Sequence, residues 1–93
     1  MSLLLRFKIS GHSMLPTLKP NQEIIVSNLP YLFFEPKVNE LIAFKNGDQF
    51  IIKRINKAKA GEYFVKGDNE KDSKDFGWIE RKKIIGKVIY IPA

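Results

Sequence analysis

Apolar and polar residues alternate with a period close to two along most of this chain, and that period is typical of β-strands rather than helices. The first strand is expected near the N-terminus, where every second residue is apolar: Leu3, Leu5, Phe7 and Ile9. Further strands are expected over residues 23–27, 40–45, 62–66 and 84–91. The pattern therefore predicts a mostly β fold that is compact, antiparallel, and barrel-like or two-layered.

Two turns and one short helical segment are also predicted. Asn46-Gly47 is a dipeptide that favours a tight hairpin turn with positive φ at both positions, so Lys53 belongs to the second strand of that hairpin. A polar stretch over residues 57–61 is expected to form another turn. The apolar segment over residues 29–34 is limited by its flanking prolines to about one helical turn.

The composition is that of one small globular domain spanning residues 1–93, with 44% hydrophobic and 28% charged residues. The chain contains no cysteine, which excludes a cysteine nucleophile, disulfides and thiolate metal sites. Because it also has a single histidine, we expect no metal and no other cofactor. Every apolar run is far shorter than the roughly 20 residues of a membrane-spanning helix, so no anchor or signal peptide is visible.

Two residues forty positions apart suggest nucleophilic catalysis, namely Ser13 and Lys53. A serine hydroxyl becomes a good nucleophile only when a neighbouring base takes its proton, and a lysine can be that base only if burial keeps it neutral. Ile51 and Ile52 would supply such apolar surroundings. Taken singly, the serine is better interpreted as a turn residue and the lysine as a surface residue of an exposed strand.

The single histidine, His12, is poorly placed to act as the base instead of a lysine. Consecutive side chains in extended backbone point to opposite faces, so His12 and Ser13 diverge unless a turn intervenes. We therefore interpret His12 as a loop or surface residue rather than as a member of a Ser-His-Asp triad.

Three segments, in this order, resemble the signal peptidase I family of Ser/Lys proteases. They are Gly-His-Ser-Met-Leu-Pro-Thr-Leu at 11–18, Phe-Ile-Ile-Lys-Arg at 50–54, and Gly-Asp-Asn-Glu-Lys-Asp-Ser-Lys-Asp at 67–75. The resemblance covers residues 7 to 91 or so. Gly-x-Ser-Met also occurs in the related self-cleaving repressors of the bacterial damage response, whereas the Gly-Asp-Asn segment points to the signal peptidase branch. Together the three segments favour the catalytic interpretation of the serine and the lysine.

The resemblance implies a role for each matching polar residue. Ser13 would attack the scissile carbonyl, and Lys53 would accept its proton and later deliver one to the leaving amine. Ser73 is similar to the family serine that hydrogen-bonds the lysine amine, and Asp75 is similar to the carboxylate that supports this loop. The backbone N–H of Ser13 would be one donor of the oxyanion hole.

The family binds its substrate, an extended peptide segment of a preprotein, beside a strand edge, with shallow apolar pockets for small residues before the cut. The matching positions in this chain are all apolar: Phe7, Ile9, Met14, Leu18 and Ile52. For Leu18, a place in the hydrophobic core is an equally good interpretation.

The chain departs from the family pattern at several turns. Many bacterial members carry a serine two positions before the nucleophile, where this chain has Gly11, so the second oxyanion donor is left open. Two Gly-Asp turns of the family are replaced here by pairs that begin with Asn21 and Asn39, and asparagine tolerates left-handed backbone. Asp68 and Asn69 are expected to shape their turn rather than to take part in the chemistry.

We interpret the chain as a minimal serine endopeptidase that cleaves signal peptides or propeptides after small residues. The resemblance implies membrane association, with the stretch from Pro30 to Phe34 as an exposed apolar patch at the bilayer surface. Burial of Phe33 and Phe34 in the core is the alternative for that stretch. For the whole protein, a soluble cytoplasmic maturation protease with one dedicated substrate is the alternative, similar to the small proteases that mature nickel superoxide dismutase.

A third interpretation is a basic β-barrel that binds nucleic acid. The net charge of +6 favours anionic partners, and four aromatic residues could stack on bases: Phe7, Tyr63, Phe64 and Trp78. This interpretation leaves the serine, lysine and Gly-Asp-Asn motifs unexplained, so we do not expect nucleic acid to be the partner.

Overall fold

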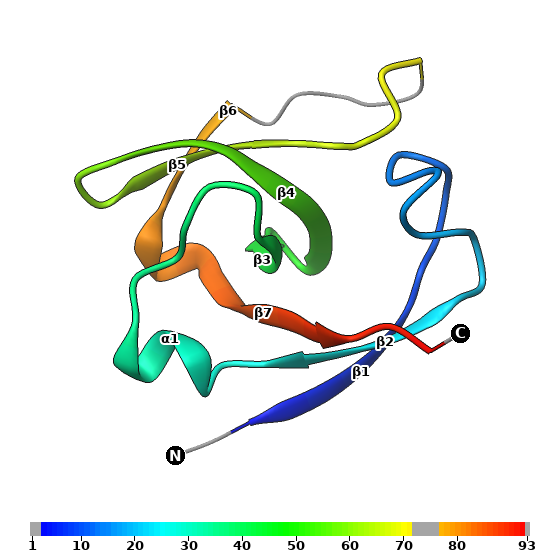
Figure 1. Cartoon of the computed structure of the whole chain (residues 1–93), viewed down its shortest axis with the longest axis horizontal. Helices are drawn as coiled ribbons and strands as arrows, with labels where there is room; N and C mark the ends of the chain where they lie inside the picture. Colours follow the sequence, from blue (N-terminus) through cyan, green and yellow to red (C-terminus); the bar gives the residue numbers. More distant parts are fainter. Residues whose placement is uncertain (1–2, 72–76, 93) are drawn as a thin grey trace.

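The computed structural model in Figure 1 describes residues 3–71 and 77–92. In this part of the chain it contains seven strands, one short α-helix and one 3-10 turn. The elements are β1 (Leu4–Lys8), β2 (Glu23–Ser27), α1 (Pro30–Phe33), β3 (Leu41–Asn46), β4 (Gln49–Lys59), β5 (Glu62–Lys66), β6 (Gly77–Glu80), η1 (Arg81–Lys83) and β7 (Ile84–Tyr90).

The seven strands form one antiparallel sheet in the order β1-β2-β7-β3-β4-β5-β6. The sheet curls into a half-barrel, as strands do when their twist accumulates over many neighbours (Figure 1). Although three strands separate β1 from β4, the curl brings the rings of Phe7 and Phe50 to 5.4 Å between centroids. The mostly β, antiparallel, barrel-like fold expected from the sequence is confirmed.

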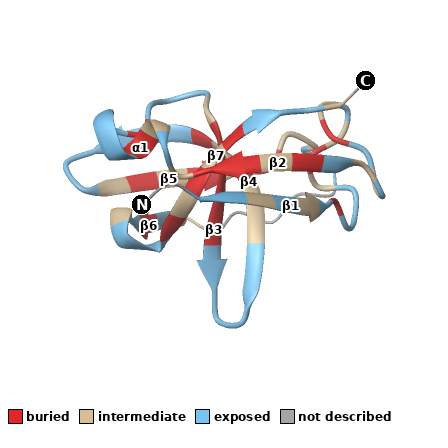
Figure 2. Ribbon diagram, turned by 90° about the horizontal axis from the view of Figure 1, so that it is seen from below, coloured by how far each residue is buried: buried red, intermediate tan, exposed pale blue. Residues whose placement is uncertain are grey.

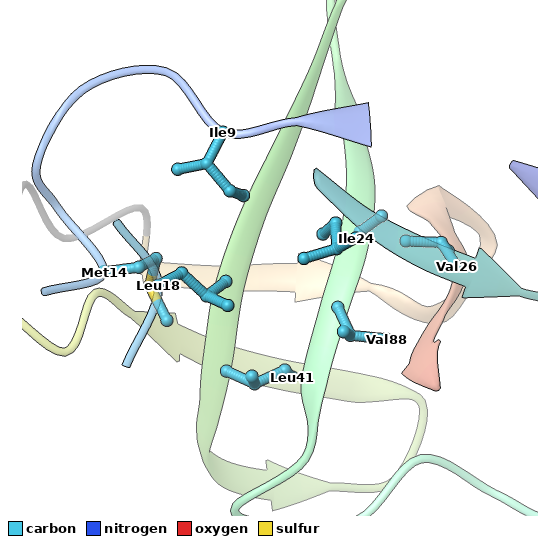
Figure 3. Close-up of a cluster of buried hydrophobic side chains, with 8 residues drawn as sticks. Ile9, Met14, Leu18, Ile24, Val26, Leu41 and Val88 are labelled. Carbon is cyan, nitrogen blue, oxygen red and sulfur yellow. The ribbon is translucent and has the colours of Figure 1, made fainter. Parts of the chain in front are cut away.

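Buried hydrophobic side chains form two groups, which lie on opposite faces of β3, because Leu41 and Ala43 belong to one group and Ile42 and Phe44 to the other. The group in Figure 3 joins the first strands to the turn that carries the serine and contains Ile9, Met14, Leu18, Ile24, Val26, Leu41, Ala43 and Val88. The second group packs on the other face of β3 and contains Tyr31, Ile42, Phe44, Ile55, Tyr63, Val65, Ile79 and Ile84. Figure 2 shows buried residues along the middle of the sheet and an exposed tip on the β3–β4 hairpin.

The hairpin register differs from the predicted one by one residue. Asn46 pairs with Gln49, so the two-residue turn is Gly47-Asp48 rather than Asn46-Gly47. Only Gly47 of these has positive φ, at 63°, which is the pattern of a type II′ turn. The prediction that Asn46 is also left-handed is therefore wrong.

The second strand of the hairpin is longer than predicted. β4 continues to Lys59 as part of the β4–β5 ladder, so the expected polar turn over residues 57–61 is reduced to Ala60 and Gly61. The ladder contains a register shift between Ile55 and Lys57, and such a bulge increases the local bend of a strand. The bend helps the sheet to curl.

The segment between β2 and β3 begins with the single helical turn α1, as the prolines predict. Tyr31 is buried and its hydroxyl donates a hydrogen bond to Glu40 at 2.7 Å, which ties α1 to the start of β3. Leu32, Phe33 and Phe34 are exposed, so the expected apolar patch is confirmed and their burial in the core is excluded. No helix in the described ranges has both the length and the apolar character needed to cross a bilayer.

Candidate active site

A pocket of about 490 Å³ lies between β1 and the first half of β4, where the curl of the sheet brings these two strands together. Both residues expected to do chemistry, Ser13 and Lys53, line it. Its remaining walls come from β1, the segment that follows β1, and β4: Phe7, Lys8, Ile9, Ser10, Met14, Gln49, Phe50, Ile51 and Ile52.

Ser13 lies in the turn that follows β1 and is half-buried. The two apolar residues after it, Met14 and Leu18, are 2% and 0% exposed and hold the turn against the core, as Figure 3 shows. Backbone hydrogen bonds close the turn, from the Leu18 N–H to the Met14 carbonyl at 2.9 Å and from the Leu15 N–H to the His12 carbonyl at 3.2 Å. The nucleophile candidate is therefore carried by a packed turn rather than by a loose loop.

Lys53 lies on β4, opposite Ile42 of β3, and only 4% of its surface is exposed. Burial disfavours the charged form of an amine, so the burial that was expected of a lysine base is present at this position. The interpretation of Lys53 as a surface lysine is excluded. His12, by contrast, is exposed and is not among the residues that line the pocket.

The expected substrate-binding residues divide into two groups. Phe7, Ile9, Met14 and Ile52 all line the pocket. Leu18 is fully buried in the core and does not line the pocket, so its side chain offers no surface to a peptide. The core interpretation of Leu18 agrees with the structure.

Two further sequence-based assignments, Ser73 and Asp75, lie outside the residues that the structure describes. Their roles beside the lysine remain predictions from the family resemblance.

Ile51 was expected as apolar surroundings for Lys53, and Ser10 had no assigned role. Three further lining residues were not anticipated: Lys8, Gln49 and Phe50. Phe50 lies against Phe7 with the two rings tilted by 57°, which closes part of the space between the strands. No local signal could have identified these residues, because the start of β4 faces β1 only after the sheet has curled. Ser10 had one indirect signal, its place three residues before the nucleophile.

Two strand edges flank the pocket. β1 pairs with β2 along one edge and is the terminal strand of the sheet. β4 pairs with β3 from Gln49 onward but with β5 only from Arg54 onward, so its first five residues have one paired edge among the described strands. Such edges present backbone N–H and C=O groups to which another extended chain can add.

Gly11 has a φ of +79°, and a β-carbon at this position would meet no atom within 4 Å. The cost of a side chain there is therefore backbone strain alone, about 1 kcal/mol. A serine in place of Gly11 would add this strain next to Ser13, so we expect no simple gain from restoring the hydroxyl of other bacterial members. Asn21 and Asn39 have φ values of 70° and 79°, which confirms that asparagine supports those left-handed turns.

The loop after β5 contacts both the turn over residues 13–17, which carries Ser13 and is called the serine turn, and strand β4, which carries Lys53 and is called the lysine strand. The Asp68 carboxylate accepts hydrogen bonds from the Arg54 guanidinium, at 2.9 Å from Nε and 2.8 Å from Nη2, and from the Thr17 hydroxyl at 2.5 Å. The hydrogen bonds from Arg54, and then the one from Thr17, hold the pKa of Asp68 below its usual value. The Asp68 hydrogen bond in turn raises the pKa of Arg54, so the pair is ionised at neutral pH.

A family model described as Peptidase S24-like matches residues 4–89 of the chain. The match spans nearly the whole sequence, and the chain belongs to this family. The protein is therefore a peptidase-type hydrolase whose catalytic fold is the curled β-sheet described above. No curated protein matches the chain significantly.

Proposed function

We propose that this protein is a serine endopeptidase that uses Ser13 as the nucleophile and Lys53 as the general base, and that it cleaves signal peptides or propeptides after small residues. The observation that carries the proposal is that these two residues line one pocket although forty positions separate them. The 4% exposure of Lys53 supports its role as a base.

The reaction follows the acyl-enzyme route of serine peptidases. The Ser13 hydroxyl oxygen attacks the scissile carbonyl carbon while its proton passes to the Lys53 amine, and the C–N bond then breaks as Lys53 returns that proton to the leaving amine. A water molecule, deprotonated by Lys53, attacks the resulting ester and releases Ser13. In this proposal the Ser13 backbone N–H donates a hydrogen bond to the developing oxyanion.

The substrate in this proposal is an extended segment that adds to the edges of β1 and of the first half of β4. Main-chain hydrogen bonds to these edges would supply affinity, and the apolar lining would select the side chains next to the cut. The lining near the serine includes Met14 and Ile52, and the Phe7–Phe50 contact narrows the space between the strands. In this proposal the apolar side chains beside Ser13 leave room for small residues next to the cut, and the polar part of the lining faces the rest of the peptide.

The proposal is tested by incubating the protein with a diverse peptide library and identifying the new termini by mass spectrometry. We expect cuts that follow small residues, in extended rather than helical peptides, and no such cuts with Ser13→Ala prepared in the same way. Cuts that persist unchanged in Ser13→Ala would come from a contaminant or another site and would contradict the proposal. A maturation protease with one dedicated substrate uses the same dyad, and it would be indicated by cleavage of very few library sequences.

The positions of the aromatic residues favour the peptidase over a nucleic-acid-binding module. Tyr63 is 4% exposed and belongs to the core, and Phe7 lines the candidate active site. Phe64 and Trp78 lie edge to face on the outer side of β5 and β6, with Lys59 placed over the Trp78 ring. Of the four proposed stacking residues, only these last two share a surface, so the set does not form one continuous platform.

We also propose that the exposed apolar residues at α1 contact a membrane surface. This α1 patch consists of Leu29, Leu32, Phe33 and Phe34, which are 45 to 74% exposed. Exposed apolar side chains grouped in this way mark interaction surfaces, and the positive net charge favours anionic lipid.

For the α1 patch we expect the protein to co-sediment with anionic vesicles and the double variant Phe33→Ser/Phe34→Ser to lose about tenfold or more of that binding, because each ring contributes on the order of 1.5 kcal/mol or more when buried. Trp78→Ser is a matched control, since it removes an exposed aromatic side chain from a different surface. Equal binding by the wild type and the Phe33/Phe34 variant would refute the membrane proposal.

A further inference from the structure

The serine turn and the lysine strand are not paired with each other in the sheet, yet catalysis by a dyad requires their reactive atoms to be held at a fixed separation. The loop after β5 supplies a connection between them. On the lysine side, Asp68 accepts two parallel hydrogen bonds from Arg54, the residue that follows Lys53. Arg54 is also tied to the turn that precedes β3, because its Nη1 donates to the Asn39 carbonyl at 2.7 Å.

On the serine side, Asp68 and the next residue, Asn69, make three contacts. Asp68 accepts a hydrogen bond from the Thr17 hydroxyl, and Thr17 lies four residues after Ser13 in the same turn. The Asn69 N–H donates to the Ser13 carbonyl at 2.8 Å, and the Asn69 side-chain amide donates to the His12 carbonyl at 2.9 Å. The nucleophile is therefore bound through its own backbone carbonyl.

We propose that Asp68 and Asn69 are positioning residues that, through Thr17 and Arg54, hold the Ser13 turn in register with the Lys53 strand. The clamp consists of four residues: Thr17, Arg54, Asp68 and Asn69. The inference rests on the proposed function of Ser13 and Lys53 and adds to it a reason why the two stay aligned. The clamp touches neither the substrate nor the reacting atoms, so its members are not catalytic residues.

The geometry of the clamp suits a rigid connection. A bidentate pair between a guanidinium and a carboxylate fixes orientation as well as distance. The side chains of Arg54 and Asp68 are 33% and 15% exposed, so water screens this pair less than it screens an ordinary surface ion pair. The clamp also lies at the point where β4 gains its second neighbour, because the β4–β5 ladder begins at Arg54 opposite Lys66. Lys53 and the four residues before it have no such support from β5.

The first test is a double-mutant cycle in the full chain with Thr17→Val and Arg54→Lys, measured as kcat and KM for a cleaved peptide at a temperature where all variants are folded. Thr17→Val removes the hydrogen bond that joins Asp68 to the serine turn and leaves the two Asn69 contacts, and Arg54→Lys keeps the charge but loses the bidentate geometry. We expect each to lower kcat by roughly 10- to 100-fold with KM within about twofold, because a misplaced dyad slows chemistry without weakening binding. The double variant should be within about threefold of the worse single variant, since either change already breaks the path from Thr17 through Asp68 to Arg54.

Tyr63→Phe is a matched control for general loss of a partly buried hydrogen bond. The Tyr63 hydroxyl donates to Glu35 at 3.2 Å, away from the pocket. We expect this variant to lower the melting temperature without lowering kcat. If the losses in the Thr17 and Arg54 variants multiply, or if kcat merely follows melting temperature across all variants including Tyr63→Phe, the clamp has no positioning role.

A second test does not depend on peptidase activity. Amide hydrogen exchange is compared between wild type and Asp68→Asn, or Thr17→Val if the former does not fold. We expect faster exchange at Asn69, whose N–H binds the Ser13 carbonyl, and unchanged exchange at Ile55, whose N–H binds the Glu40 carbonyl at 3.0 Å. Unchanged exchange at Asn69 would overturn the clamp. If the wild type cleaves no peptide, the proposed function fails, and the exchange result still decides whether the two segments are coupled.

Discussion

Ser13→Ala and Lys53→Ala should each lower kcat/KM for peptide cleavage by about 10⁴-fold or more, and the double variant should be little worse than either single one. The nucleophile and its base act in the same proton transfer, so removal of either residue abolishes that step. Removal of the second residue then causes little further loss. Steady-state kinetics on one cleaved library peptide measures this effect.

Two additional lysine variants sharpen that result. Lys53→Arg should be as inactive as Lys53→Ala, because a guanidinium keeps its proton at any usable pH. Lys57→Ala removes an exposed lysine from the same strand and should retain wild-type kinetics. Substantial turnover by Ser13→Ala, or by Lys53→Arg, would be incompatible with the proposed dyad.

Gly86→Ala should lower the free energy of unfolding by about 3 kcal/mol, a large fraction of the stability of a domain of this size. Gly86 lies on β7, where a β-carbon would be 2.5 Å from the Ser27 carbonyl oxygen and 2.7 Å from the Ser27 carbonyl carbon. Both atoms are backbone of the neighbouring strand β2, so the contact can be relieved only by separating paired strands. The denaturant midpoint of chemical unfolding measures the loss.

Gly61→Ala provides the comparison for Gly86→Ala. Gly61 is in the exposed β4–β5 turn with a φ of +73°, and a β-carbon there would meet nothing within 4 Å. Its replacement should cost about 1 kcal/mol from backbone strain alone. Equal losses in the two variants would mean that the close approach of β2 to β7 is not what requires Gly86.

Strands with a clear local signal could be predicted from the sequence, whereas features set by pairing partners could not. β2 occupies residues 23–27 as predicted, because its run of three β-branched residues, Ile24, Ile25 and Val26, is local information. β6 was missed because it has four residues with only Ile79 buried, and it forms because β5 presents an edge to it. The hairpin turn was misplaced by one residue because the pairing of Asn46 with Gln49 sets its position.

For the candidate site, the two dyad residues could be predicted from the sequence, but their shared pocket and the contacts of Asp68 could not. The chemistry of serine and lysine, together with the family resemblance, identified Ser13 and Lys53 from sequence. Their common pocket forms because the curl of the sheet brings β1 close to β4. The pattern of apolar and polar residues within one strand cannot predict that curl. Asp68 was interpreted as a turn residue because only its neighbours in sequence were visible. Its partners Thr17 and Arg54 are 51 and 14 positions away.

The coupling between residues 13 and 53 is measured most directly with Ser13→Cys, because the natural chain contains no cysteine and the introduced thiol is therefore the only one. The rate of its alkylation by iodoacetamide is followed against pH, with and without Lys53→Met. We expect the pKa of this thiol to lie below the usual value of about 8.5, because an adjacent amine accepts its proton, and to return toward that value with Lys53→Met. Identical pH profiles in the two proteins would contradict a Ser13/Lys53 dyad.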